Sequence, residues 1–291
     1  MESVIYFFGS GLAFFVGLLL IGAAIGLACL ADYPRLRRWH AVLGIAGVML
    51  VALSAAPLPY VLYGIGGVAC LVWLIGEQFA RFASARLWLR GSLAMVLAIG
   101  FAMEIPYQIA PRVPKSPLKL LLFGDSVSAG MGEGNSVERW PQRLSRLHPI
   151  EVHDHSHMGA TVRTMLRESE PLSFEPGVVL LEIGGNDLLG STKVADFERD
   201  LALLIERVTG PGRTVVMFEL PLPPFANEFG RVQRRLAAQH GVPLIPKRLF
   251  VGVLTAEGAT VDSVHLSPSG HVRMQELVAD AVFRESLPSG L

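Results

Sequence analysis

An uncharged apolar stretch extends from Ser3 to Ala31 near the start of this chain. A helix needs about 20 apolar residues to cross the hydrocarbon core of a bilayer, so this stretch is long enough for one crossing. The composition agrees, because the 291 residues are 51% hydrophobic and only 17% charged, which is more apolar than an ordinary soluble domain. The sequence therefore predicts an all-α transmembrane region over residues 1–107.

Four membrane-spanning helices are predicted, at about residues 5–30, 41–57, 59–76 and 87–107. The second and third come from one long uncharged stretch that Pro57 and Pro59 divide, because proline interrupts a helix. The fourth is the least apolar, since a charged residue lies near each of its ends. We expect Arg90 and Glu104 to extend their charged groups to the two membrane surfaces.

The arginines predict how these helices are oriented. Residues 32–40 and residues 77–90 carry three arginines each, and arginine-rich loops stay on the cytoplasmic side of a membrane. With four spans, both ends of the chain then face away from the cytoplasm. We therefore expect an integral membrane protein of a bacterial inner membrane, with its C-terminal domain in the periplasm or otherwise outside the cytoplasm. With three spans, that domain would be cytoplasmic.

The cysteines and the charge balance indicate no other chemistry. Cys29 and Cys70 both lie in predicted spans, where a thiol packs as a small apolar side chain. Beyond Tyr107 the chain has 19 basic and 21 acidic residues, a balance that gives no sign of nucleic-acid binding. Membrane lipids are expected partners, and the helices offer a surface to a membrane protein partner.

The C-terminal part has the pattern of an α/β fold. Residues 108–117 are rich in proline and are predicted to be a stiff linker. Over residues 118–291, apolar segments such as LKLLLFG and GVVLLEIGG alternate with amphipathic helical patterns. Unbroken apolar strands separated by helices are typical of a parallel sheet that is covered on both faces.

Polar residues stand where the strands of this region are predicted to end. Ser126 follows the first strand, Gly159 the second and Asn186 the third, whereas Asp262 and His265 share a loop near the C-terminus. In a parallel sheet such positions gather at one edge. Each residue alone is also a common choice for a turn or a helix start, so only the combination indicates a site.

Together these residues contain the parts of an acyl-transfer site. A serine hydroxyl is a weak nucleophile unless an imidazole takes its proton and a carboxylate orients that imidazole. His265 and Asp262 can supply these two groups for Ser126. The oxyanion of the tetrahedral intermediate needs hydrogen-bond donors, for which the candidates are the amides of Ser126 and Gly159 and the side chain of Asn186.

The motifs GDSVSAG, HMGAT, GGND and DSVHLS resemble the blocks of the SGNH (GDSL-type) hydrolase family, over roughly residues 118–291. The resemblance implies that Ser126 is the nucleophile, that Asp262 and His265 complete a triad, and that Gly159 and Asn186 belong to the oxyanion hole. It also implies a flavodoxin-like three-layer α/β/α sandwich and the hydrolysis of carboxylic esters, with no cofactor. Valine replaces the usual leucine in GDSV, and histidines precede the glycine of HMGAT where many relatives have asparagine.

Three functions remain open at this point. The first is an esterase that uses water as the acceptor, and the second is an O-acyltransferase that moves an acyl group to or from an envelope glycan. The third is a non-catalytic domain that binds a glycan or a partner, which an intact triad disfavours. The expected substrate is an ester-bearing small molecule, lipid or glycan, with an acetyl or short acyl group.

The remaining histidines allow two further interpretations. His153, His155 and His157 alternate along one predicted strand, where they could bind zinc, but a surface or pocket-lining role is the more common one. His271 is an alternative general base, although its place inside the last predicted helix favours a surface position. Asp125 is expected to brace the turn that carries the serine rather than to act on substrate.

Overall fold

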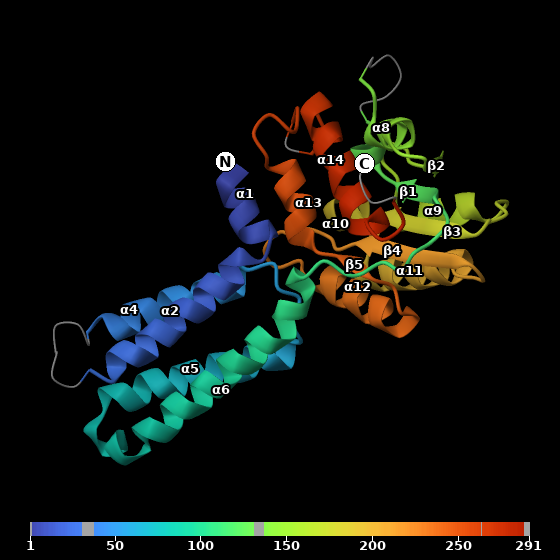
Figure 1. Cartoon of the computed structure of the whole chain (residues 1–291). Helices are drawn as coiled ribbons and strands as arrows, with labels where there is room; N and C mark the ends of the chain where they lie inside the picture. Colours follow the sequence, from blue (N-terminus) through green and yellow to red (C-terminus); the bar gives the residue numbers. More distant parts are fainter. Residues whose placement is uncertain (1, 31–37, 131–136, 263, 288–291) are drawn as a thin grey trace. The chain divides into compact units, whose positions relative to one another are not determined.

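The computed structural model describes residues 2–30, 38–130, 137–262 and 264–287. They form two compact units (Figure 1). The helical unit consists of Phe7–Gln108 with Pro223–Asn227, and the sheet unit consists of Ile109–Leu222 and Glu228–Leu291 with the first six residues. Arg35 and Arg37 of the first arginine-rich loop lie outside the described residues, as does Ser263 of the DSVHLS motif.

The helical unit is built on α2 (Leu12–Ala28), α4 (Trp39–Leu53), α5 (Tyr60–Gln78) and α6 (Arg86–Glu104), with the 3-10 turns η1 (Ala80–Ala85) and η2 (Ile105–Gln108) beside α6. Two described segments, Tyr60–Gln78 and Arg81–Gln108, are long and apolar enough to cross a membrane. The number rises to three if α1 (Glu2–Gly9) and α2 are counted as one span.

The first predicted span, residues 5–30, is not one continuous helix. α1 and α2 are bent by 73° relative to each other, because Gly11 between them has a φ of +87°, which an α-helix does not contain. α4 has 15 residues and is about 22 Å long at 1.5 Å per residue, less than a usual crossing requires. Of the four predicted spans, α5 and α6 therefore meet the length requirement outright.

Arg90 of α6 pairs with Glu77 of α5. Its guanidinium donates hydrogen bonds of 2.7 and 2.9 Å to the Glu77 carboxylate and one of 2.8 Å to the carbonyl oxygen of Ala28. Glu104, the last residue of α6, is fully buried. The two hydrogen bonds between Arg90 and Glu77 compensate the burial of these two charges. The contact joins the end of α2 to the α5–α6 connection, so both arginine-rich loops start from the same end of the helical unit.

The sheet unit contains five parallel strands in the order β2-β1-β3-β4-β5. They are β1 (Lys119–Gly124), β2 (Glu151–Asp154), β3 (Gly177–Glu182), β4 (Arg213–Phe218) and β5 (Leu244–Ile245). This is the strand order of flavodoxin-like sheets. All of β3 is buried, as expected for a central strand covered on both faces. The predicted α/β class with a parallel sheet is confirmed.

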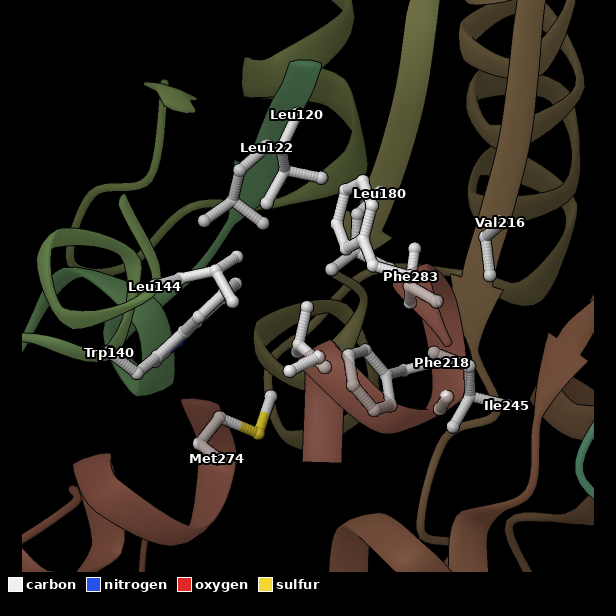
Figure 2. Close-up of a cluster of buried hydrophobic side chains, with 14 of the residues drawn as sticks. Leu120, Leu122, Trp140, Leu144, Leu180, Val216, Phe218, Ile245, Met274 and Phe283 are labelled. Carbon is white, nitrogen blue, oxygen red and sulfur yellow. The ribbon is translucent and has the colours of Figure 1, made fainter. Parts of the chain in front are cut away.

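Helices cover both faces of this sheet and complete three layers (Figure 1). On one face lie α8 (Trp140–Leu147), α13 (Lys247–Leu254) and α14 (Pro268–Phe283); on the other lie α9 (Val162–Ser169), α11 (Val194–Val208) and α12 (Asn227–His240). Figure 2 shows the first interface, in which Trp140 and Leu144 of α8 and Met274 of α14 pack toward Leu122 of β1. Two short helices, α7 (Ser126–Ala129) and α10 (Gly185–Leu189), follow β1 and β3 directly.

The segment predicted as a linker packs against the sheet unit. Val113 is 4% exposed and belongs to the hydrophobic core, and the Ser116 amide donates a hydrogen bond to Ser286 Oγ at 3.0 Å. An apolar side chain among the prolines explains this, because its burial favours contact with the core over free extension. Residues 109–117 therefore form part of this unit.

Candidate active site

Ser126 is the first residue of α7, at the end of β1 where the sheet presents its carboxyl edge. Asp125 before it caps the helix, since its Oδ1 accepts a hydrogen bond from the Val127 amide at 2.9 Å. The Asp125 amide in turn donates to the carbonyl oxygen of Glu182 in β3 at 3.1 Å. Ser126 is 8% exposed. The predicted bracing role of Asp125 matches these contacts.

Asp262 and His265 form a hydrogen-bonded pair. His265 Nδ1 lies 2.6 Å from Asp262 Oδ2, and the His265 amide donates to Asp262 Oδ1 at 2.9 Å. These two hydrogen bonds, the backbone one first, lower the pKa of Asp262 to about 2. The carboxylate is therefore ionised at neutral pH and holds the proton of the imidazole on Nδ1. His265 Nε2 is left as the proton acceptor.

Two contacts bring three of the predicted loops together at this edge of the sheet, and one electrostatic interaction reaches the fourth. A Cβ atom on Gly185 would lie 3.0 Å from Asp125 Oδ2, so the turn after β3 touches the turn after β1. Asn186 Nδ2 donates to the carbonyl oxygen of Ala160 at 2.9 Å, which joins it to the Gly159 loop. A protonated His265 lowers the pKa of Asp125, so the C-terminal loop lies within electrostatic range of the serine turn.

The described residues include no hydrogen bond between Ser126 and His265. Hydrogen bonds between a nucleophile and its base are often long without substrate and shorten in the reacting complex. Of the predicted triad, the hydrogen bond between His265 and Asp262 is formed.

The Gly159 loop is held by two neighbouring side chains. In addition to the Asn186 bond to Ala160, Asp187 Oδ2 accepts a hydrogen bond from the Val162 amide, the first residue of α9, at 2.9 Å. Gly159 has a φ of +73°, a conformation that glycine adopts without strain. The side chain of Asn186 therefore lies beside the Gly159 loop.

Asp125 and Glu182 are buried acids whose pKa values are both raised. Burial, the largest cause, raises the pKa of Asp125 to about 6, against the opposing effects of the Val127 hydrogen bond and His265. Complete burial, followed by the nearby Asp125, raises the pKa of Glu182 well above its ordinary value. Glu182 is not among the site residues that the sequence motifs predict. The feature that could have indicated it is a single glutamate at the end of the otherwise apolar strand GVVLLE.

His271 is not at the surface, contrary to the prediction. It is 2% exposed, and its Nδ1 accepts a hydrogen bond from the Trp140 amide at 3.3 Å. Burial, and then the charges of Arg139 and Arg143, lower the pKa of His271 to about 4. His271 is buried because it lies on the face of α14 that packs against α8. The residue pattern of α14 alone does not reveal this contact. His271 is therefore a neutral structural group.

The three alternating histidines have separate partners. His153 Nε2 lies 2.8 Å from Glu151 Oε1, and His157 Nε2 lies 3.1 Å from Glu168 Oε1. The His155 ring stacks on the ring of Phe123 with 5.5 Å between centroids. No group of three or more metal-binding side chains is found within the described part of the chain.

Comparison with known proteins adds independent information. Residues 122–273 match the GDSL-like lipase/acylhydrolase family. The chain is 29% identical to the esterase TesA of Pseudomonas aeruginosa over 172 residues, which covers 55% of this chain and 85% of TesA. It is 27% identical to the arylesterase of Vibrio mimicus, over 57% of this chain and 88% of that protein.

A solved structure has the same fold as the sheet unit. The psychrotrophic esterase EstA from Pseudoalteromonas sp. superposes with a TM-score of 0.52 at 20% identity, over 57% of this chain and 97% of EstA. At this identity the likeness concerns the fold alone, and the family match carries the activity. The chain belongs to the GDSL-like lipase/acylhydrolase family and is an SGNH-type hydrolase that acts on ester bonds.

Proposed function

We propose that this protein is a membrane-anchored serine esterase that works through Ser126, His265 and Asp262. The observation that carries the proposal is the 2.6 Å contact between His265 Nδ1 and Asp262 Oδ2, on a loop that lies near the turn of Ser126. This contact orients the imidazole with Nε2 free to accept the serine proton, which is the requirement of a triad. The names of the relatives TesA and arylesterase support ester bonds as the target.

Each group then has one role in the reaction. His265 Nε2 takes the proton of Ser126 Oγ while Oγ attacks the ester carbonyl. The oxyanion accepts hydrogen bonds from the Ser126 and Gly159 amides and from Asn186. His265 gives the proton to the departing alcohol, which leaves an acyl-enzyme. Water then repeats the sequence, releases the carboxylic acid and restores the serine. Asp262 stays ionised throughout and stabilises the imidazolium.

We further propose that the helical unit lies in the membrane and that the catalytic domain, residues 118–291, faces away from the cytoplasm. Two or three of its described helices are suited to cross a membrane. The contact of Arg90 with Ala28 supports a cytoplasmic position for both arginine-rich loops, because it holds their starting points at one end of the unit. Envelope esters with acetyl or short acyl groups are then the available substrates.

The test is covalent labelling of the full-length protein in detergent with a fluorophosphonate, together with hydrolysis of p-nitrophenyl acetate, butyrate and octanoate. The proposal expects label on the peptide that contains Ser126, no label in Ser126→Ala, and the highest turnover on the shorter esters. Equal labelling of Ser126→Ala would overturn the nucleophile assignment. An acetylated sugar, offered with and without an acceptor alcohol, separates hydrolysis from acyl transfer.

A further inference from the structure

A buried carboxyl group lies directly beneath the turn that carries Ser126. Glu182, the last residue of β3, is 3% exposed. Its Oε2 accepts a hydrogen bond of 2.7 Å from Ser128 Oγ and a longer one of 3.4 Å from the Asp125 amide. Ser128 Oγ accepts in turn from Trp140 Nε1 at 3.1 Å. This chain of contacts, the Glu182–Ser128–Trp140 network, connects β3 to α7 and α8.

The network has no charged partner within the described residues. The contrast is Glu219, which follows β4 and is equally buried, but pairs with Arg234 at 2.6 Å and with Lys247 at 3.1 Å. A buried carboxyl without a cation favours its neutral form. Glu182 therefore serves as a hydrogen-bonding group rather than as a charge.

α7 depends on such contacts because it is a single turn. Its four residues are joined to the chain by few backbone hydrogen bonds, among them Gly130 N to Ser126 O at 3.0 Å, and one isolated turn does not hold its own conformation. Ser128, two residues after the nucleophile, is fully buried. It packs so closely under the strand end that a Cβ atom on Gly124 would lie 2.8 Å from it. The far side of Trp140 is fixed in the hydrophobic core (Figure 2).

We infer that Glu182 is a positioning residue for the esterase: through Ser128 and Trp140 it fixes the turn of α7, and thereby the direction of Ser126 Oγ toward the ester carbonyl. The inference rests on the proposed role of Ser126 as nucleophile. Glu182 itself touches neither substrate nor the reacting atoms. Its effect is on geometry, where a displacement of the order of 1 Å costs about 10²-fold in rate.

Conservative and disruptive variants of Glu182 distinguish a role in positioning Ser126 from a contribution to the stability of the fold alone. Glu182→Gln retains one acceptor and one donor, the pattern of a neutral carboxyl, so it keeps the bond from Ser128. Glu182→Leu has a similar volume and no acceptor. Ser128→Ala removes the middle member of the network with less disturbance to the core, and it keeps the test decisive if Glu182→Leu does not fold.

The experiment measures the rate of fluorophosphonate labelling, kcat, KM and Tm for the full-length protein in detergent. We expect Glu182→Gln to label within about threefold of the unsubstituted protein. Glu182→Leu and Ser128→Ala should label roughly 10- to 100-fold more slowly with KM little changed. Ser169→Ala is the matched control, because Ser169 is also fully buried but its hydroxyl donates only within its own helix, to Leu166 O, and its labelling rate should be normal.

The failures of the two proposals are distinguishable. If the unsubstituted protein does not label at Ser126, the nucleophile assignment is wrong. If it labels and both Glu182→Leu and Ser128→Ala match its rate, only the role of Glu182 is overturned. A Glu182→Gln variant as slow as Glu182→Leu would also overturn it, because the charge rather than the hydrogen bond would then be essential.

Discussion

The side-chain amide of Asn186 donates a hydrogen bond to the carbonyl oxygen of Ala160 at 2.9 Å. The turn after β3 therefore holds the loop after β2, although 26 residues separate the two in the chain. An amide carries two N–H groups, so this contact leaves a second one for the oxyanion of the proposed mechanism. The same contact fixes the direction in which that second group points.

Asn186→Ala should lower kcat by about 10²–10³-fold, because it removes one donor from the developing oxyanion. The measurement is steady-state hydrolysis of p-nitrophenyl butyrate, with Tm recorded to verify folding. Asp187→Asn is the neighbouring comparison, since its side-chain oxygen can still accept from the Val162 amide, and it should lose far less activity. A rise in KM alone for Asn186→Ala would identify a substrate-binding residue instead.

Asp262→Asn should lower kcat by about 10³–10⁴-fold, because the amide no longer holds the His265 proton on Nδ1. The control is Asp280→Asn, which removes an exposed carboxylate of α14 that pairs with Arg284 just after the helix and should leave kcat unchanged. Esterase turnover of the two purified variants checks this. Comparable activity in both would show that Asp262 does not orient the base.

His265→Ala should lose at least about 10³-fold in turnover, as expected for a general base, whereas His271→Gln should retain much more. The reason is that His271 is buried against the Trp140 amide with its pKa lowered to about 4. The measurement is kcat on p-nitrophenyl acetate for both variants at pH 7.5. The reverse order of activities would mean that His271 is the base.

His271 should also make the protein less stable in acid. Its folded pKa of about 4 lies below the ordinary 6.5, so the unfolded chain binds the extra proton between these values and stability falls as pH drops through that window. At pH 5 the loss is about 2 kcal/mol, or very roughly 4–8 °C in Tm. Acidification from pH 7 to pH 5 should therefore lower Tm less in His271→Gln.

The comparison of the unsubstituted protein with His271→Gln separates the effect of His271 on stability from the effects of the buried acids. The raised pKa of Asp125 acts in the opposite direction, because between 3.8 and about 6 the folded protein keeps a proton that the unfolded chain releases, so stability falls as pH rises through that window. This contribution is common to the unsubstituted protein and the variant, so it cancels in the difference between them. An identical acid-induced change in Tm for the two proteins would contradict the structural role given to His271.

A topology experiment tests the orientation of the sheet unit. With four crossings and cytoplasmic arginine loops, alkaline phosphatase fused after residue 291 should be active and green fluorescent protein fused there should be dark. Replacing Arg81 and Arg86 with glutamine should reduce that bias, because the second loop would keep only Arg90. A bright fluorescent fusion with an inactive phosphatase would establish the cytoplasmic orientation and remove envelope esters as substrates.

Local pattern was sufficient to predict the class of the fold and the chemistry of the motifs. Alternating apolar strands and amphipathic helices predicted a parallel sheet, and strand-end motifs predicted which residues to inspect around Ser126, because both signals lie in short stretches of chain. The resemblance of the blocks to a hydrolase family led to the same activity as the family match over residues 122–273.

Only the tertiary structure shows which side chains from distant parts of the chain contact one another. The sequence cannot reveal that Arg90 meets Glu77 and Ala28, or that His271 faces Trp140, because each contact depends on how two helices are rotated against each other. For the same reason, the sequence identifies Glu182 only as the end of a strand. Its hydrogen bond from Ser128 of α7 is visible only in the tertiary structure. The amino-acid sequence determined which chemical groups are present and which element carries each. Packing alone decided which of them are buried, and burial sets their charge.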